Sequence, residues 1–302
     1  MEAKMQCVKS NLGLVCITNS EAVRYKTVTR KRLLSFDEKT QKEMLRALYQ
    51  ENINRLNRGI EFCTANEINL YRLTSGLFPF SDEPIGAEIL DEFTNQLAET
   101  GKKAIEKSLR LVIHPDQFVV LSSDSENVIK NSVKILKMHA RTLDLLQQPR
   151  SQWTTMNIHG GKGDRLDKLV ESIEKLPDEI RSRIAFENDE HAYSSAQILE
   201  VCRRAKVPMV FDAHHHVCRE KLDDYNHPSV AETFWAARET WGNPDWQLVH
   251  ISNGREKFQD RAHSDLIFTM PDVFRFAPWI EVEAKHKELA IAKLQTEWLA
   301  RP

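Results

Sequence analysis

Short apolar runs recur along the chain, separated by longer stretches with the periodicity of amphipathic helices. The runs are almost continuously apolar, as expected for strands that are buried on both faces of a sheet. They predict eight strands, at Leu12–Ile17, Leu70–Thr74, Leu109–Ile113, Thr154–Ile158, Arg183–Phe186, Val207–Phe211, Gln247–Ile251 and Trp279–Val282.

Helical periodicity fills most of the intervals between these strands. The predicted helices span Phe36–Asn57, Ala87–Lys107, Ser125–Leu146, Arg165–Glu174, Ser194–Arg204 and Val230–Glu239. Strands that alternate with helices predict an α/β protein, a (β/α)8 TIM barrel that forms a single domain over residues 1–302. An open, doubly wound sheet is the alternative, but it would concentrate the polar residues at one switch point.

Most of the predicted strands end in a side chain that can bind a metal ion. The endings are His114, His159, Glu187, Asp212, His250 and Glu283, with Asp82 after a further apolar run as a weaker case. Because the carboxyl ends of parallel barrel strands meet at one face, we expect these side chains to converge there. Imidazole and carboxylate groups without thiolate are the ligands of a multinuclear hydrolytic centre.

Each ending also has an ordinary structural explanation, because a lone histidine at a strand end is more often hydrogen-bonded than metal-bound. Local context favours the metal interpretation at several positions. Glu187 directly follows a buried strand, where a carboxylate must be paired, neutralised or metal-bound. His159 precedes a glycine-rich segment that lets a phosphate approach the backbone. Together, the endings are hard to explain as packing alone.

Composition is that of a globular protein, with 41% hydrophobic and 28% charged residues. The net charge of −2 gives no global basic field, although bound divalent cations could supply one locally for a polyanionic substrate. The five cysteines form no CxxC pair and indicate reduced thiols. With no signal pattern and no membrane-spanning run, we expect a cytoplasmic protein, nucleoid-associated in a prokaryote or nuclear in a eukaryote.

The sequence resembles the UV-damage endonucleases, metal-dependent DNA repair enzymes built on a TIM barrel. The resemblance covers nearly the whole chain. It is carried by Asn11-Leu12-Gly13-Leu14, Tyr25 to Arg30, Ile68 to Ser75, Leu77 to Phe80, His114-Pro115-Asp116-Gln117-Phe118, Asn157 to Gly161, Glu187-Asn188-Asp189, Asp212 with His215, His250-Ile251-Ser252 and Glu283 to Lys287.

The resemblance implies a cluster of up to three manganese ions. It assigns the metal to His114, His159, Glu187, Asp212, His215, His250, His263 and Glu283, of which we expect His114, His159, Glu187 and Glu283 to be catalytic. The ligand types suit Mn²⁺ or Zn²⁺ better than Mg²⁺, and the resemblance favours two or three Mn²⁺ ions.

Three positions depart from the family pattern. Asp82 stands where the family often has a histidine ligand, and aspartate is a competent replacement. Leu248 stands where some members have a modified, metal-binding lysine, so one metal is expected to be held differently or weakly. Leu14 replaces an early tyrosine that could have stacked on DNA.

The implied activity is cleavage of the phosphodiester backbone immediately 5′ of pyrimidine dimers in double-stranded DNA, by a monomer. Gln117 and Phe118 resemble a wedge that fills the stack vacated by damaged bases. We expect phosphate contacts from Lys162, Arg165, Lys285 and Lys287. A sugar isomerase or epimerase with a similar metal centre is the main alternative, and an apurinic-site endonuclease is the nearest related activity. The basic stretch from Arg24 to Arg32 favours a DNA enzyme.

Overall fold

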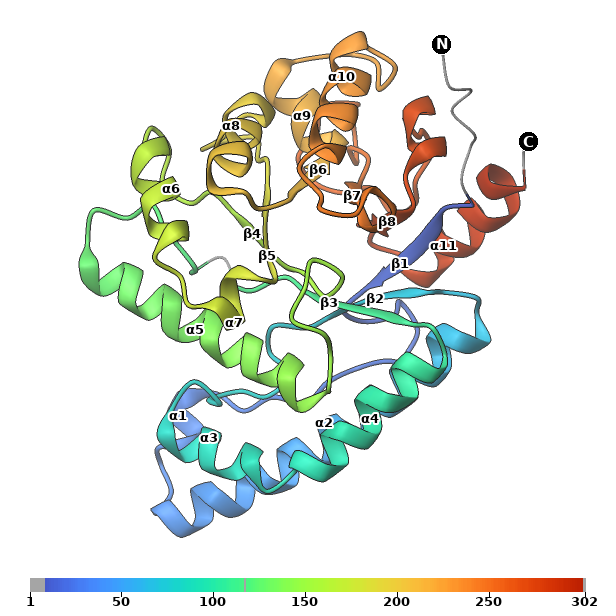
Figure 1. Cartoon of the computed structure of the whole chain (residues 1–302). Helices are drawn as coiled ribbons and strands as arrows, with labels where there is room; N and C mark the ends of the chain where they lie inside the picture. Colours follow the sequence, from blue (N-terminus) through green and yellow to red (C-terminus); the bar gives the residue numbers. More distant parts are fainter. Residues whose placement is uncertain (1–8, 117, 301–302) are drawn as a thin grey trace.

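The computed structural model describes residues 9–116 and 118–300, which form a closed barrel of parallel strands (Figure 1). The strands are β1 (Asn11–Val15), β2 (Leu70–Leu73), β3 (Arg110–Ile113), β4 (Met156–His159), β5 (Ile184–Glu187), β6 (Met209–Asp212), β7 (Leu248–Ile251) and β8 (Trp279–Val282). Each strand pairs with the next, and β8 closes the barrel on β1. The predicted TIM barrel is confirmed, and the open doubly wound sheet is excluded.

Helices connect the strands and surround the barrel (Figure 1). They are α1 (Arg30–Leu33), α2 (Glu38–Ala65), α3 (Pro84–Asp91), α4 (Thr94–Glu106), α5 (Glu126–Leu145), α6 (Leu166–Glu174), α7 (Asp178–Arg181), α8 (Ser195–Ala205), α9 (Ala213–Glu220), α10 (Pro228–Arg238) and α11 (Glu288–Leu294), with shorter turns η1 (Pro244–Trp246), η2 (Asp272–Phe276) and η3 (Gln295–Leu299). Within the described ranges, none of these helices has the length and apolar character needed to cross a membrane.

Two predicted helices differ from the observed ones. The helix predicted to end at Asn57 continues to Ala65, because Ile60 and Cys63 extend its buried face by two more turns. The helix predicted over Ala87–Lys107 is divided into α3 and α4, since regular helix stops after Asp91 and restarts at Thr94. Predicted strand boundaries shift by one or two residues, and every predicted strand is present.

The segment with three consecutive histidines is the start of helix α9, which the sequence analysis did not predict. Asp212 is the N-cap, and its side chain accepts a hydrogen bond of 2.7 Å from the His215 backbone N–H. Because successive helical residues point about 100° apart, His214, His215 and His216 face different surroundings. Only one of the three can then face a given site.

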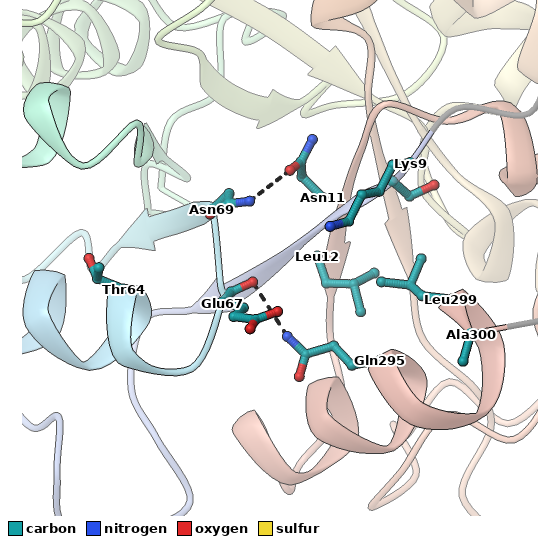
Figure 2. A pocket seen from close by; sticks show the side chains of 10 residues that line it. Lys9, Asn11, Leu12, Thr64, Glu67, Asn69, Gln295, Leu299 and Ala300 are labelled. Carbon is teal, nitrogen blue, oxygen red and sulfur yellow. Dashed lines mark hydrogen bonds between the residues drawn. The ribbon is translucent and has the colours of Figure 1, made fainter.

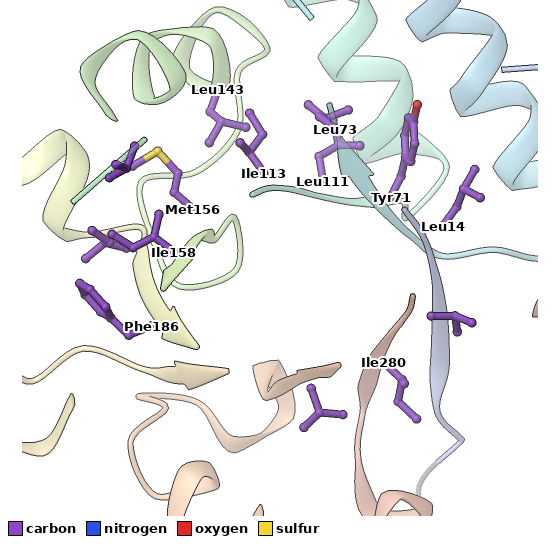
Figure 3. Packing of buried hydrophobic residues seen from close by; sticks show 14 of the residues in the cluster. Leu14, Tyr71, Leu73, Leu111, Ile113, Leu143, Met156, Ile158, Phe186 and Ile280 are labelled. Atoms are coloured by element: carbon purple, nitrogen blue, oxygen red, sulfur yellow. The ribbon is translucent and has the colours of Figure 1, made fainter. Parts of the chain in front are cut away.

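Side chains of the strands alternate between an outer core and an inner layer. Outward residues such as Leu14, Tyr71 and Leu111 belong to the main core between barrel and helices (Figure 3). Inward residues form a second apolar cluster inside the barrel, made of Leu70, Val112, Ala185, Val210, Trp241, Leu248 and Trp279. Leu14 is therefore fully buried in the outer core.

The amino-terminal end of the barrel is filled by a buried arginine among tryptophans. The Arg110 guanidinium lies 4.9 Å from the Trp153 ring centroid and 5.2 Å from that of Trp279. It donates hydrogen bonds to the backbone carbonyls of Gln152, Trp153 and Trp246. These contacts satisfy a fully buried cation without a carboxylate.

Candidate metal centre

The predicted strand-end residues converge at the carboxyl end of the barrel. His159, Glu187 and Asp212 are the last residues of β4, β5 and β6. His250 lies within β7, and His114 and Glu283 directly follow β3 and β8. Because all eight strands are parallel, short strands that end in polar residues bring those residues together at one face.

Glu187 lies at the middle of this cluster. Its carboxylate belongs to two groups in which one ligand atom from each residue lies within 4.8 Å of the others, one with His114 and His159 and one with Asp212 and His215. The His114 Nε2 atom lies 3.3 Å from Glu187 Oε2. Asn157, on β4, donates a 2.5 Å hydrogen bond to the same oxygen. A carboxylate shared by two groups has the geometry of a bridging ligand.

Unsatisfied ligand atoms within the cluster fit a divalent cation. His159 Nδ1 and Asp212 Oδ2 are buried and have no hydrogen-bond partner among the described residues. Buried polar atoms are rarely left unpaired, because their desolvation is not compensated. Imidazole and carboxylate ligands together suit Mn²⁺ or Zn²⁺. The donor set of this chain therefore fits the metal that the resemblance implies.

His215 is oriented by a chain of polar contacts. Its Nδ1 atom lies 2.6 Å from Glu190 Oε2, and Arg261 Nε lies 2.7 Å from the other oxygen of Glu190. Burial lowers the pKa of His215, but Asp212 and the hydrogen bond that the ring donates to Glu190 outweigh this effect and raise the pKa to about 10. In this arrangement, His215 Nε2 faces Asp212 Oδ2 at 3.8 Å.

A third group contains Glu281, a residue that the sequence analysis missed. Ligand atoms of His250, Glu281 and Glu283 lie within 4.8 Å of one another. Glu281 lies two residues before Glu283, so both face the barrel interior from β8. The interrupted apolar run Ile280-Glu281-Val282 was the available signal, because an inward glutamate in a buried strand requires a partner.

Other predicted ligands lie at the edge of the cluster or outside it. His263 Nδ1 is 4.0 Å from Glu283 Oε2, which places it beside the third group. Asp82 belongs to none of the three groups. Its carboxylate pairs with Lys134 on α5 at 2.8 Å. Leu248 lies in the inner apolar layer, two residues before His250 on the same face of β7.

The predicted DNA-contacting residues differ in exposure. Phe118 is 68% exposed and therefore lies outside the core. Lys162 and Arg165 both pair with Asp124, at 2.5 and 3.1 Å. Lys285 is exposed and Lys287 is partly buried. Gln117 lies outside the described residues.

Two pockets lie at opposite ends of the barrel. One, of about 440 Å³, is lined by residues of the metal cluster, including His114, His159 and His215, and by Glu190. The other, at the amino-terminal ends of β1 and β2, is shown in Figure 2. There the Asn69 side chain donates to Asn11, and Gln295 donates to the backbone carbonyl of Glu67. This second pocket lacks the cluster of histidines and carboxylates.

Fold and site together define a TIM-barrel enzyme with a candidate metal centre at the carboxyl end of the strands. The model of the UV-endonuclease UvdE family matches residues 10–300. The chain belongs to this family. A UV DNA damage endonuclease of Nostoc sp. is 54% identical over 95% of this chain and 90% of its own length. One of Deinococcus radiodurans is 46% identical over 94% of both chains.

A solved structure supports the fold independently. The crystal structure of SacUVDE superimposes with a TM-score of 0.75 at 23% sequence identity, over 94% of this chain and 96% of the other. At that level of identity, the similarity concerns the arrangement of strands and helices. The family assignment confirms the resemblance that the sequence motifs indicated.

Proposed function

We propose that this enzyme cuts double-stranded DNA immediately 5′ of UV photoproducts at a multinuclear divalent metal centre. Family membership supports a UV-damage endonuclease. The observation that carries the multinuclear centre is the position of Glu187, whose carboxylate is shared by two groups of potential ligands. When bound, divalent cations supply charge neutralisation at the phosphoryl group and activate water for its attack.

The residues of the centre divide into holding and orienting roles. His114, His159, Glu187, Asp212 and His215 hold the metal ions in this proposal, and His250, His263 and Glu283 extend the centre toward β7 and β8. Asn157 and Glu190 orient Glu187 and His215. Mn²⁺ is the proposed metal, because the mixed imidazole and carboxylate set favours a borderline cation over Mg²⁺.

DNA recognition in this proposal separates phosphate contacts from lesion contacts. Lys162, Arg165, Lys285 and Lys287 contact phosphates, which carry no sequence information. Phe118 projects from the loop after β3 and enters the stack where damaged bases have left it. Extruding a dimer costs less than extruding intact bases, because a dimer stacks and pairs poorly. The exposed ring supports this role, since no core packing accounts for it.

The other candidate activities have less support. A sugar isomerase or epimerase would need no exposed aromatic beside the centre, and the family match is to endonucleases. Cleavage at abasic sites is compatible with the same centre as a side activity. We propose a monomer that acts inside the cell on chromosomal DNA.

The test is incubation of the purified enzyme with Mn²⁺ and an end-labelled duplex that carries one cyclobutane dimer. Undamaged duplex, abasic duplex and a ketose sugar are tested in parallel. A nick immediately 5′ of the dimer is expected, with no cut in undamaged DNA and no conversion of the sugar. Cutting elsewhere, or only at the abasic site, would contradict the proposed specificity.

A further inference from the structure

One of the three ligand groups already contains a fixed positive charge. Arg72, on β2, points into the barrel, where one of its terminal nitrogens lies 2.8 Å from Glu281 Oε2 and 2.5 Å from Glu283 Oε1. The Arg72 and Glu281 side chains are 11% and 1% exposed, so water screens this interaction weakly. The guanidinium nitrogen thus occupies the position at which the two carboxylates meet.

The location of this ion pair follows from the barrel. Glu281 and Glu283 are on the same face of β8, so their like charges need a cation between them. Strand β1 separates β8 from β2, and its inward residue opposite Glu281 is Gly13. Gly13 has no side chain, and a Cβ there would meet the Leu70 side chain on β2, so strands β1 and β2 pack closely below the ion pair.

The same ion pair fixes His250. His250 Nε2 lies 2.8 Å from Glu281 Oε2, and its Nδ1 atom lies 3.0 Å from Glu187 Oε1. The imidazole is completely buried. Glu281 is therefore a positioning residue that holds the ring with Nδ1 toward the shared carboxylate.

The other two ligand groups differ from this one. No arginine or lysine pairs with Glu187 or Asp212 among the ion pairs of the described residues. Buried polar atoms without a hydrogen-bond partner are found in all three groups, at His159 Nδ1 and Asp212 Oδ2 in those two and at His250 Nε2 in this one, so the difference between the groups is the arginine. The partners of Glu187 and Asp212 are thus histidines, which can give up a proton to bind a metal ion, whereas the guanidinium of Arg72 keeps its charge.

We propose that Arg72 takes the place of a divalent cation between Glu281 and Glu283, so that the centre of this chain binds two metal ions, both at the groups that share Glu187. This inference rests on the proposed metal-dependent function. A centre with two metal ions is also consistent with Leu248. Its side chain lies in the apolar layer below His250 and supplies no ligand for a third ion.

The test counts bound ions. Chelator-treated protein is titrated with Mn²⁺, and free Mn²⁺ is followed by its electron paramagnetic resonance signal. The unmodified protein is expected to bind two ions per chain. Arg72→Met removes the guanidinium at similar volume, and should raise the number to three because Glu281 and Glu283 then require another cation. Arg58→Met, at an exposed arginine on α2, is the matched control and should bind two.

Glu281→Gln provides a second variant that keeps a hydrogen-bond acceptor for His250. It should still bind two ions, and circular dichroism establishes that each variant is folded. Three ions in the unmodified protein, a loss of one ion in Glu281→Gln, or two ions in folded Arg72→Met would each overturn the proposal. If the unmodified protein bound no Mn²⁺, the proposed metal-dependent function would be overturned as well. If it bound three ions, only the proposal about Arg72 would be overturned.

Discussion

The Nε2 atom of His114 lies 3.3 Å from the Oε2 atom of Glu187, so the carboxyl ends of β3 and β5 meet at one carboxylate. The second oxygen of Glu187 faces His250 at 3.0 Å. Glu187 therefore has a histidine on each side.

Glu187→Gln is expected to reduce nicking of damaged DNA by at least about 100-fold. Mutating a residue that only supports a metal ligand typically costs up to about 100-fold in activity, and Glu187 is proposed to be a ligand itself. The amide keeps the volume but cannot bridge two cations. Binding of damaged DNA should be nearly unchanged, as measured by fluorescence anisotropy. Glu171→Gln, at an exposed glutamate on α6, is the control. Near-normal nicking by Glu187→Gln at saturating Mn²⁺ would contradict the role of Glu187.

Phe118→Ala is expected to weaken the preference for damaged over undamaged duplex by about 1–3 kcal/mol, the scale of one base–aromatic stack. Lys285→Ala should instead weaken binding to both duplexes and flatten the salt dependence, because phosphate contacts do not distinguish them. Titration of both variants against both duplexes at two salt concentrations separates these effects. Equal weakening of both duplexes by Phe118→Ala would argue against a lesion-probing role.

Glu190→Gln is expected to lower the affinity for Mn²⁺ by about 10–100-fold, because a carboxylate that orients a ligating histidine contributes on that scale. Glu190 contacts His215 at 2.6 Å, and Arg261 holds its other oxygen. Isothermal titration with Mn²⁺ measures the change. Glu200→Gln, on the exposed side of α8, is the control. An unchanged Mn²⁺ affinity would show that Glu190 does not position His215.

Acid should destabilise the protein through His139. Burial lowers the pKa of this imidazole from 6.5 to about 4, more than Asp82 raises it. The unfolded chain therefore binds a proton that the folded chain does not, and stability falls as the pH decreases from 6.5 to 4. At about 1.4 kcal/mol for each pH unit, the total loss from this group is on the order of 3 kcal/mol.

Urea unfolding at a series of pH values tests this prediction on His139→Phe, which keeps an aromatic ring without a titrating group. The variant should lose less unfolding free energy than the unmodified protein over this pH range. His227→Phe, at an exposed histidine, should follow the unmodified protein. Identical pH dependence in all three proteins would exclude His139 as a source of acid sensitivity.

The barrel and the strand-end ligands could be predicted from sequence because both depend on local patterns. Continuous apolar runs indicate strands buried on two faces, and a polar residue after each run indicates where that strand reaches the surface. Glu187 and His250 follow from this reasoning alone.

Residues that act across the barrel could not be found in this way. Arg72 and Glu281 lie inside apolar strands, and their pairing depends on β2 and β8 flanking β1 in the closed barrel. Asp82, whose family position predicts a ligand, also pairs with Lys134 on a neighbouring helix, a contact that the local sequence does not indicate. The partners of Arg72 and of Asp82 both depend on contacts between segments that are distant in the sequence.

Four of the six tryptophans lie near Arg110 and contribute a large part of the intrinsic fluorescence. Trp153, Trp241, Trp246 and Trp279 gather near the amino-terminal ends of the strands, at the opposite end from the metal centre. The emission of these four indoles reports whether the amino-terminal end of the barrel is folded. DNA bound at the carboxyl end should leave their surroundings unchanged. Loss of folding and loss of DNA binding can therefore be monitored separately in one sample, with tryptophan for the first and a labelled duplex for the second.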